Sequence, residues 1–254
     1  MTGQHRVIAT VQVRMGSSRL QGKTLLEING QPLLGHLLDR LERTRRLNGV
    51  VVATPIGPDN DPVEQYCQTR GIACYRGSED DVLDRMLKAL QWMRATIGVE
   101  VFGDCPLIDP AIVDAMVDAY VDADGALDFI GNDLTTTYPP GMEVEVFSVA
   151  ALEDSARRAS DPAVREHGTL FIRQNPSLYR IRNVEAPPHH HHPDLELEID
   201  APEDVPVISA IIRQFSGKPD FTLDDVIAFM GNNPALTKLN TDVPRRWKVT
   251  RTNG

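Results

Sequence analysis

The sequence predicts an α/β protein, with a mainly parallel sheet sandwiched by helices in a single domain. Short runs of β-branched residues alternate with longer segments whose apolar residues recur at helical spacing, and this alternation is typical of parallel sheets. The clearest strands are VIATVQV at 7–13, VVVAT at 50–54 and VEVFG at 99–103. A length of 254 residues without an internal repeat fits one large domain.

Composition narrows the class of protein. The apolar content is 41%, as in globular proteins, and the formal net charge of −10 argues against a general nucleic-acid binder. Three cysteines, Cys67, Cys74 and Cys105, lack paired spacing, which favours a reducing compartment. Without an apolar run of about 18 residues or a signal-peptide core, we expect a cytoplasmic protein with no membrane contact.

The stretch 7–23 carries the strongest functional pattern. The strand at 7–13 ends in a loop that contains two glycines, several hydroxyl groups and three cations: Gly16, Gly22, Ser17, Ser18, Thr24, Arg14, Arg19 and Lys23. Backbone amides of small residues and converging cations both stabilise a polyphosphate. The alternative is an ordinary βα turn with solvated basic residues.

A Walker P-loop is rejected for this stretch. Five residues separate Gly16 from Gly22, where a P-loop has four. A P-loop lysine also opens a helix, whereas Lys23 is soon followed by Asn29-Gly30, a strong tight-turn signal. We expect the first helix to start later, around Pro32.

The same stretch resembles the opening signature of the sugar-activating nucleotidyltransferases. The pattern R-M-G-S-S-R-L-x-G-K, followed by L-x-x-I-x-G-x-P-L-L, is most similar to cytidylyltransferases of the bacterial spore-coat polysaccharide type, relatives of the CMP-sialic acid and CMP-Kdo synthetases. The resemblance implies a Rossmann-like nucleotide-diphospho-sugar transferase fold that uses CTP and Mg²⁺. It also implies that Arg14, Arg19 and Lys23 neutralise phosphates, next to nucleotide contacts from Gly16, Ser17 and Ser18.

The second strand and the segment after it extend the predicted nucleotide site. In the family, the loop after the A-T strand faces the base, which implicates Thr54. Ser78 can cap a helix whose acidic first turn complements the helix dipole, and this alone explains most of residues 79–81. Since G-S-E-D-D-V-L-x-R resembles the second family signature, the resemblance also places Arg76, Ser78, Asp81 and Arg85 near the nucleotide.

Two aspartates follow the third strand. Asp104 comes at its carboxyl end, where open α/β sheets place ligands, and a carboxylate there suits Mg²⁺. Asp109 precedes Pro110 and a helical pattern, so a helix cap is favoured for it. G-D-C-P-L-I-D-P resembles the metal motif of the family, in which Cys105 needs no catalytic role.

The resemblance implies that residues 128–185 bind the acceptor and form a dimer contact. Glu143 and Glu145 alternate with apolar residues on one strand, either as a solvated face or, by resemblance, as acceptor ligands. A helix is expected from Asp161. It carries three residues that resemble the R-E-H-[VT]-T motif: Arg165, Glu166 and His167. An arginine there can pair with an acceptor's carboxylate or phosphonate, or simply with Asp161.

The last part of the chain supplies the second metal ligand that the resemblance implies. LELEID at 195–200 alternates apolar and acidic residues and ends in Asp200, which has capping-box spacing with Glu203. The family usually shows Arg-Leu-Thr before this aspartate, whereas this chain has Glu196 and Glu198. The charge around Asp200 therefore departs from the family pattern. The histidines at 189–192 are predicted to form an exposed loop, with transition-metal binding as the alternative.

The whole chain, 1–254, is therefore predicted to be one nucleotidyltransferase domain with a helical tail at 216–254. The expected protein is a homodimer that transfers CMP from CTP to an acidic, nonulosonic-type sugar and releases pyrophosphate. A phosphonate or another small acid is the alternative acceptor. The rival classes are a P-loop-like kinase and a silent protein that only binds a nucleotide sugar.

Overall fold

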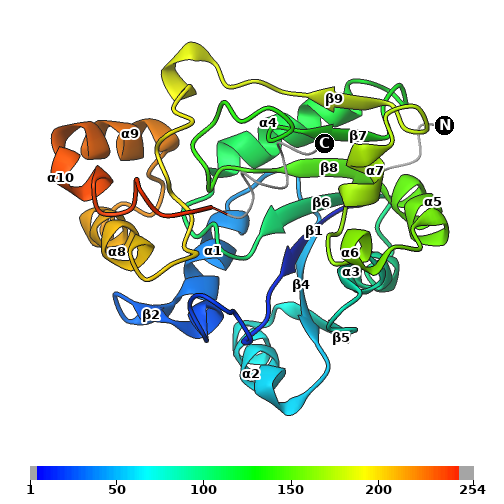
Figure 1. The fold of residues 1–254 in the computed structure, drawn as a ribbon, viewed down its shortest axis with the longest axis horizontal. Helices are drawn as coiled ribbons and strands as arrows, with labels where there is room; N and C mark the ends of the chain where they lie inside the picture. The colour runs from blue at the N-terminus through cyan, green and yellow to red at the C-terminus, as the bar shows by residue number, and fades with distance from the viewer. Residues whose placement is uncertain (1–4, 246–254) are drawn as a thin grey trace.

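A seven-stranded sheet forms the centre of the computed structural model, which describes residues 5–245 (Figure 1). The strand order is β5-β4-β1-β6-β8-β7-β9. The first four of these strands are mutually parallel: β5 (Ala73–Gly77), β4 (Gly49–Pro55), β1 (Val7–Gln12) and β6 (Ile97–Phe102). The three strongest strand predictions are confirmed, and so is the predicted fold class.

The remaining strands make the sheet mixed. The strand β8 (Glu145–Ser148) runs antiparallel to both β6 and β7 (Phe129–Gly131), while β9 (Ile181–Asn183) runs parallel to β7 at the edge. Segment 128–185 therefore supplies three of the seven strands.

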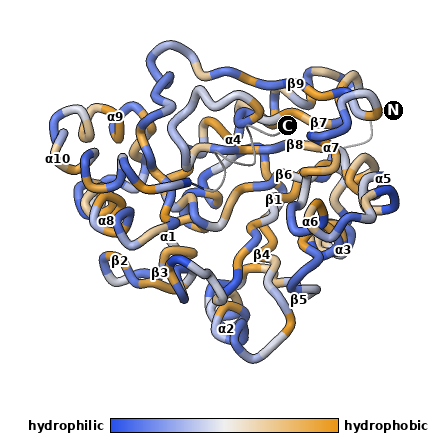
Figure 2. The backbone as a smooth tube through the Cα atoms, in the orientation of Figure 1, coloured by the Kyte–Doolittle hydropathy of each residue, from blue (hydrophilic) through white to orange (hydrophobic). Residues whose placement is uncertain are grey.

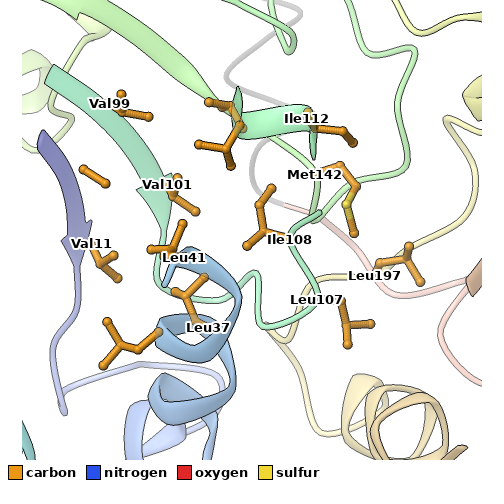
Figure 3. Close-up of a cluster of buried hydrophobic side chains, with 14 of the residues drawn as sticks. Val11, Leu37, Leu41, Val99, Val101, Leu107, Ile108, Ile112, Met142 and Leu197 are labelled. Atoms are coloured by element: carbon orange, nitrogen blue, oxygen red, sulfur yellow. The ribbon is translucent and has the colours of Figure 1, made fainter. Parts of the chain in front are cut away.

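Helices cover both faces of the sheet and create two cores. Val7, Ala9 and Val11 of β1 belong to the larger core, packed with α1 (Leu33–Leu41), α4 (Pro110–Val121) and α8 (Asp204–Gln214) (Figure 3). Ile8 points to the other core, with α3 (Val82–Trp92) and α5 (Val149–Arg158). This division follows from the two-residue period of a strand. The central strands β4 and β6 are accordingly hydrophobic along much of their length (Figure 2).

The connection from β1 to α1 confirms the rejection of a P-loop. Lys23 begins a single 3₁₀ turn, Lys23–Leu25, and the chain then forms the hairpin β2 (Glu27–Ile28) and β3 (Gln31–Pro32). Asn29 and Gly30 have φ values of 53° and 79°, as a two-residue hairpin turn of type I′ requires. The helix α1 starts at Leu33, so Lys23 lies outside any α-helix.

Three predicted local features are wrong. Asp81, and not Ser78, is the N-cap residue of α3, because its carboxylate accepts from the amide of Asp84. The capping box between Asp200 and Glu203 does not form. Asp204 instead accepts from the amides of Asp200 and Ala201, at 2.8 and 2.7 Å.

The third error concerns the helix expected from Asp161. Asp161 caps a helix as predicted, but α6 (Pro162–Arg165) is only four residues long and is separated from α7 (Leu170–Gln174). Gly168 is buried in the break, and a Cβ there would lie 2.9 Å from the Glu100 carboxylate and 2.4 Å from Met86. This close packing leaves no room for a side chain at position 168.

The rest of the chain follows the predicted pattern. Asp109 caps α4 and Thr222 forms a capping box at the start of α9 (Leu223–Asn232). The remaining helices are α2 (Asp61–Arg70), α10 (Pro234–Thr237) and the 3₁₀ turns Pro58–Asn60 and Pro188–His190. Of the predicted tail 216–254, residues 246–254 lie outside the described part. Within residues 5–245, no helix has the length and apolar character of a membrane span.

Candidate active site

Lys23, Asp104 and Asp200 meet at the carboxyl ends of the central parallel strands. The Lys23 ammonium donates to Asp104 Oδ2 and Asp200 Oδ1, each at 3.1 Å, and to the Ile199 carbonyl at 3.0 Å. Asp104 lies two residues after the end of β6, and a backbone bond of 2.8 Å from the Ile199 amide to the Asp104 carbonyl joins its loop to segment 195–200. Residues from three distant parts of the sequence therefore form one cluster.

The cluster is electrostatically balanced. Burial lowers the pKa of Lys23, but the charges of Asp104 and Asp200 outweigh this effect, so its pKa is raised and the ammonium persists. Arg19 forms an ion pair with Asp200, and its Nη1 also donates to the Pro244 carbonyl at 3.3 Å. Two carboxylates thus face two cations.

The glycine- and serine-containing loop between β1 and Lys23 is held by backbone bonds. The amides of Ser17 and Gly22 both donate to the Met15 carbonyl at 3.0 Å, and Gly22 has a φ of 71°, which favours glycine. The Thr24 hydroxyl donates to the Arg14 carbonyl, and the buried Asn60 side chain accepts from the Met15 amide. The loop is therefore preformed, with Arg14, Gly16 and Ser18 exposed.

The oxygen donors around Lys23 fit a hard divalent cation. Asp104 Oδ2 and Asp200 Oδ1 each lie 3.1 Å from the Lys23 Nζ atom. The distance between these two oxygens is therefore at most twice 3.1 Å. Two carboxylates and a backbone carbonyl are oxygen ligands of the kind that Mg²⁺ takes.

Cys105, next to Asp104, is not equipped for nucleophilic chemistry. It is buried, and burial together with the charges of Asp104 and Glu143 raises the pKa of its thiol. The thiol stays protonated, and the thiolate is the nucleophilic form.

The predicted nucleotide residues Thr54 and Arg76 lie near the carboxyl ends of β4 and β5, and only the Arg76 side chain is bound by other groups of the described chain. Arg76 donates to Asp61 at 2.6 Å and Glu64 at 2.8 Å, and also to the Gly57 carbonyl, which ties down the loop after β4. Thr54, at the end of β4, is buried, and its hydroxyl has no partner within the described residues.

Arg85 is buried beneath the same region. It donates to the Gln12 side chain at 3.0 Å and to the Ser78 carbonyl, so it joins the end of β1 to the loop before α3. Burial, and then the positive charge of Arg14, lower the pKa of Arg85 to about 10, which leaves it charged at neutral pH. Its role in this structure is to shape the loop around Ser78.

The predicted acceptor residues separate into two groups. Arg165 pairs with Asp81 at 2.8 Å and donates to the Ala156 and Ala159 carbonyls, so the pairing with Asp161 is wrong. Asp81 and Arg165, from different predicted sites, are thus joined. Glu166 and His167 follow α6 and are exposed.

Glu143 and Glu145 are buried, so the solvated strand face is wrong. Glu143 precedes β8 and accepts from the Gly141 amide at 2.7 Å. Glu145, within β8, pairs with Arg173 of α7 at 2.7 Å. Because helices cover both faces of this sheet, both sets of alternating residues are buried.

Sequence reasoning missed the groups around Glu145. Arg173 also pairs with Asp133 at 3.0 Å, the Thr169 hydroxyl donates to Glu145, and Glu100 of β6 lies opposite Glu145. Burial, and then the charge of Glu145, raise the pKa of Glu100 well above its ordinary range. The sequence did contain one indication of this buried group, namely a glutamate at position 100 within the otherwise apolar run 97–102.

Comparisons with known proteins identify the class. The fold resembles a CMP-2-keto-3-deoxy-manno-octonic acid synthetase solved with CTP, at a TM-score of 0.64 and 19% identity over 82% of this chain and 99% of that one. At this identity the likeness shows the fold, which is that of the Rossmann-like nucleotidyltransferases.

The particular family is also shown. The model of the cytidylyltransferase family matches residues 8–230, so the chain belongs to that family. It is 32% identical to the spore coat polysaccharide biosynthesis protein SpsF of Bacillus subtilis (strain 168), over 93% of this chain and 99% of that protein. A cytidylyltransferase structure from Leptospira borgpetersenii matches at a TM-score of 0.89 and 30% identity, over 95% of this chain and all of that one.

A narrower match links the chain to an enzyme of named activity. It is 36% identical to the 3-deoxy-manno-octulosonate cytidylyltransferase of Geobacter sulfurreducens over 110 residues, which is 42% of each chain.

Proposed function

We propose that this protein transfers CMP from CTP to an acidic sugar, with Mg²⁺ as cofactor and pyrophosphate as the second product. The observation that carries the proposal is the Lys23 ammonium held between Asp104 and Asp200 at the carboxyl ends of the sheet strands. A triphosphate with a divalent cation needs this combination of cations and carboxylates.

The reaction is an in-line displacement at the α-phosphorus. An acceptor hydroxyl oxygen forms the new bond to phosphorus, the bond to the β-phosphate bridging oxygen breaks, and the hydroxyl proton passes to solvent. Lys23 and Arg19 leave their carboxylates and neutralise the departing pyrophosphate, assisted by the exposed Arg14. Asp104 and Asp200 would hold Mg²⁺, which supplies charge compensation at the phosphates when bound.

The relatives support the acidic sugar. The names of SpsF and of the 3-deoxy-manno-octulosonate cytidylyltransferases connect the family with polysaccharide synthesis and with an acidic sugar. A phosphonate or another small acid is the second candidate, since it presents a similar anion. We also expect a cytoplasmic homodimer, and three unpaired cysteines agree with a reducing compartment.

The test is pyrophosphate release across a matrix of four nucleoside triphosphates and a panel of acidic sugars and phosphonates, with and without Mg²⁺. We expect turnover with CTP, Mg²⁺ and an acidic sugar. Equal or better turnover with ATP, giving ADP, would overturn the proposal, and release only with phosphonates would move it to the second candidate.

The metal ligands are tested in the same assay. Asp104→Asn and Asp200→Asn keep the side-chain shape but remove charge, so each should lower kcat about 10²-fold or more. Normal turnover of either variant at saturating Mg²⁺ would assign that aspartate a structural role only.

A further inference from the structure

A buried arginine near the C-terminus contacts the segment that carries Asp200. Arg245 is 4% exposed, and its two terminal nitrogens donate to the two carboxylate oxygens of Asp204, at 2.9 and 2.6 Å. Asp204, the first residue of α8, is completely buried. Such a two-point pair fixes the position and the plane of both groups.

Asp204 in turn holds the turn at Asp200. Its Oδ2 accepts from the backbone amides of Asp200 and Ala201, at 2.8 and 2.7 Å, in addition to Arg245. Burial raises the pKa of Asp204, but the hydrogen bonds from Arg245 and from these two amides lower it by more. The pKa of Asp204 is therefore below its ordinary value. Asp204 is therefore an anion that binds Arg245 on one side and the Asp200 backbone on the other.

Arg245 also compensates the acidic strip that precedes Asp200. Its guanidinium lies 3.4 Å from Glu196 and 3.6 Å from Glu198, both of which are buried. The Asn240 side chain adds a bond of 2.9 Å to Asp204 and one of 3.2 Å to the Glu196 carbonyl. Loss of Arg245 would leave several buried acidic groups without their cation, and segment 195–200 would have to move.

The same tail reaches Asp200 by a second route. The carbonyl of Pro244 accepts from Arg19, and Arg19 forms an ion pair with Asp200. Residues 244 and 245 therefore contact two of the groups that bind Asp200: Arg19 at its carboxylate and Asp204 at its backbone.

We propose that Arg245 is a positioning residue which, through Asp204, fixes the Asp200 carboxylate and so sets the affinity of the site for a divalent cation. The inference rests on the proposed function, because it assumes that Asp200 is a metal ligand. It adds that segment 240–245, far from the nucleotide-binding signature in sequence, is part of the catalytic architecture.

The experiment measures Mn²⁺ binding to the full chain without nucleotide, by electron paramagnetic resonance of free Mn²⁺. In Arg245→Met, we expect affinity to fall at least about tenfold, the range for losing an outer partner of a metal ligand. The Mg²⁺ concentration for half-maximal turnover should rise similarly, with a smaller change in kcat. Arg245→Lys, which keeps the charge but not the two-point geometry, should recover part of the affinity.

The control is Val226→Ala, which destabilises a buried position in α9 and should leave Mn²⁺ affinity unchanged. If Arg245→Met does not fold, the double variant with Glu196→Gln removes one buried acidic group and is measured instead. Wild-type Mn²⁺ affinity in a folded Arg245→Met or double variant would overturn the inference, as would a wild-type chain that binds no Mn²⁺. Failure of the wild type to use CTP would overturn the proposed function. The comparison of Mn²⁺ affinity between the wild type and Arg245→Met would still test the role of Arg245.

Discussion

At the scale of residues, the candidate site is organised around exchangeable ion pairs. Lys23 and Arg19 are paired with Asp104 and Asp200, and the proposed reaction requires both cations to contact phosphate oxygens. This arrangement keeps buried charge compensated before substrate arrives. It also means that neither cation acts alone, since both neutralise Asp200.

Substitution of Lys23 and Arg19 tests this arrangement. Because Lys23 begins a 3₁₀ turn and not an α-helix, no helix dipole supplements its charge. Arg19 should therefore matter nearly as much as Lys23 for the use of CTP. We expect Lys23→Ala and Arg19→Ala each to cost about 2–4 kcal/mol in kcat/KM for CTP. The exposed Arg157→Ala is the control. A near-wild-type Arg19→Ala beside an inactive Lys23→Ala would contradict the shared role.

A pH prediction follows from Glu100. Its raised pKa means that the folded chain holds a proton that the unfolded chain releases near the ordinary pKa of about 4.3. Its contribution to stability is therefore complete below that pH and is lost as pH rises through the folded-state pKa, by up to about 1.4 kcal/mol per pH unit.

Glu100→Gln removes this titration, so the free energy of unfolding should decline less between pH 5 and alkaline pH than in the wild type. Urea unfolding across that range measures it, with exposed Glu153→Gln as the control. Identical pH profiles for Glu100→Gln and the wild type would show that Glu100 is ionised in the folded chain.

At the scale of elements, the site depends on segments that are not regular secondary structure. Segment 195–200 contains no helix or strand and is fixed by two backbone bonds, from Leu197 to Pro140 and from Ile199 to Asp104. Gly141 has a φ of 105°, and a Cβ there would lie 2.6 Å from the backbone of Leu197. Only glycine lets segments 139–143 and 195–200 lie this close.

Gly141→Ala should therefore displace the segment that carries Asp200. We expect a loss of about 2 kcal/mol or more in the free energy of unfolding, from backbone strain and overlap together, and a higher Mg²⁺ concentration for half-maximal activity. Gly125→Ala, also at positive φ but with open space around it, is the matched control for strain alone. Equal effects of the two substitutions would show that the close approach to Leu197 contributes nothing.

The sequence was informative where the signal is local. The Asn29-Gly30 turn and the cap at Asp109 depend on neighbouring residues and were predicted correctly. The two acidic residues at 196 and 198 lie in the segment where the resembling family usually shows Arg-Leu-Thr, and they had no local explanation. Their partner is Arg245, some fifty residues away, and no periodicity in either segment indicates such a contact.

At the scale of the whole molecule, the two halves of the sheet carry two different groups of charged residues. The parallel half, β5-β4-β1-β6, ends at the Lys23 cluster, whereas β8, β7 and β9 come from segment 128–185 and carry the buried Glu145 group (Figure 1). Its last strand, β9, pairs only with β7 within the described residues and is therefore an edge. Leu178, shortly before β9, is 52% exposed.

Exposed edge strands and exposed apolar side chains are often buried by contact with a second chain. We therefore expect the predicted homodimer to form through segment 128–185. Light scattering after size exclusion should give twice the chain mass of 28.1 kDa at micromolar concentration. Leu178→Arg should shift the chain toward monomer, because a charge would be buried in the contact. Leu239→Arg, at a similarly exposed leucine in the tail, should remain dimeric. A wild-type monomer, or dissociation by Leu239→Arg alone, would place the contact elsewhere or exclude it.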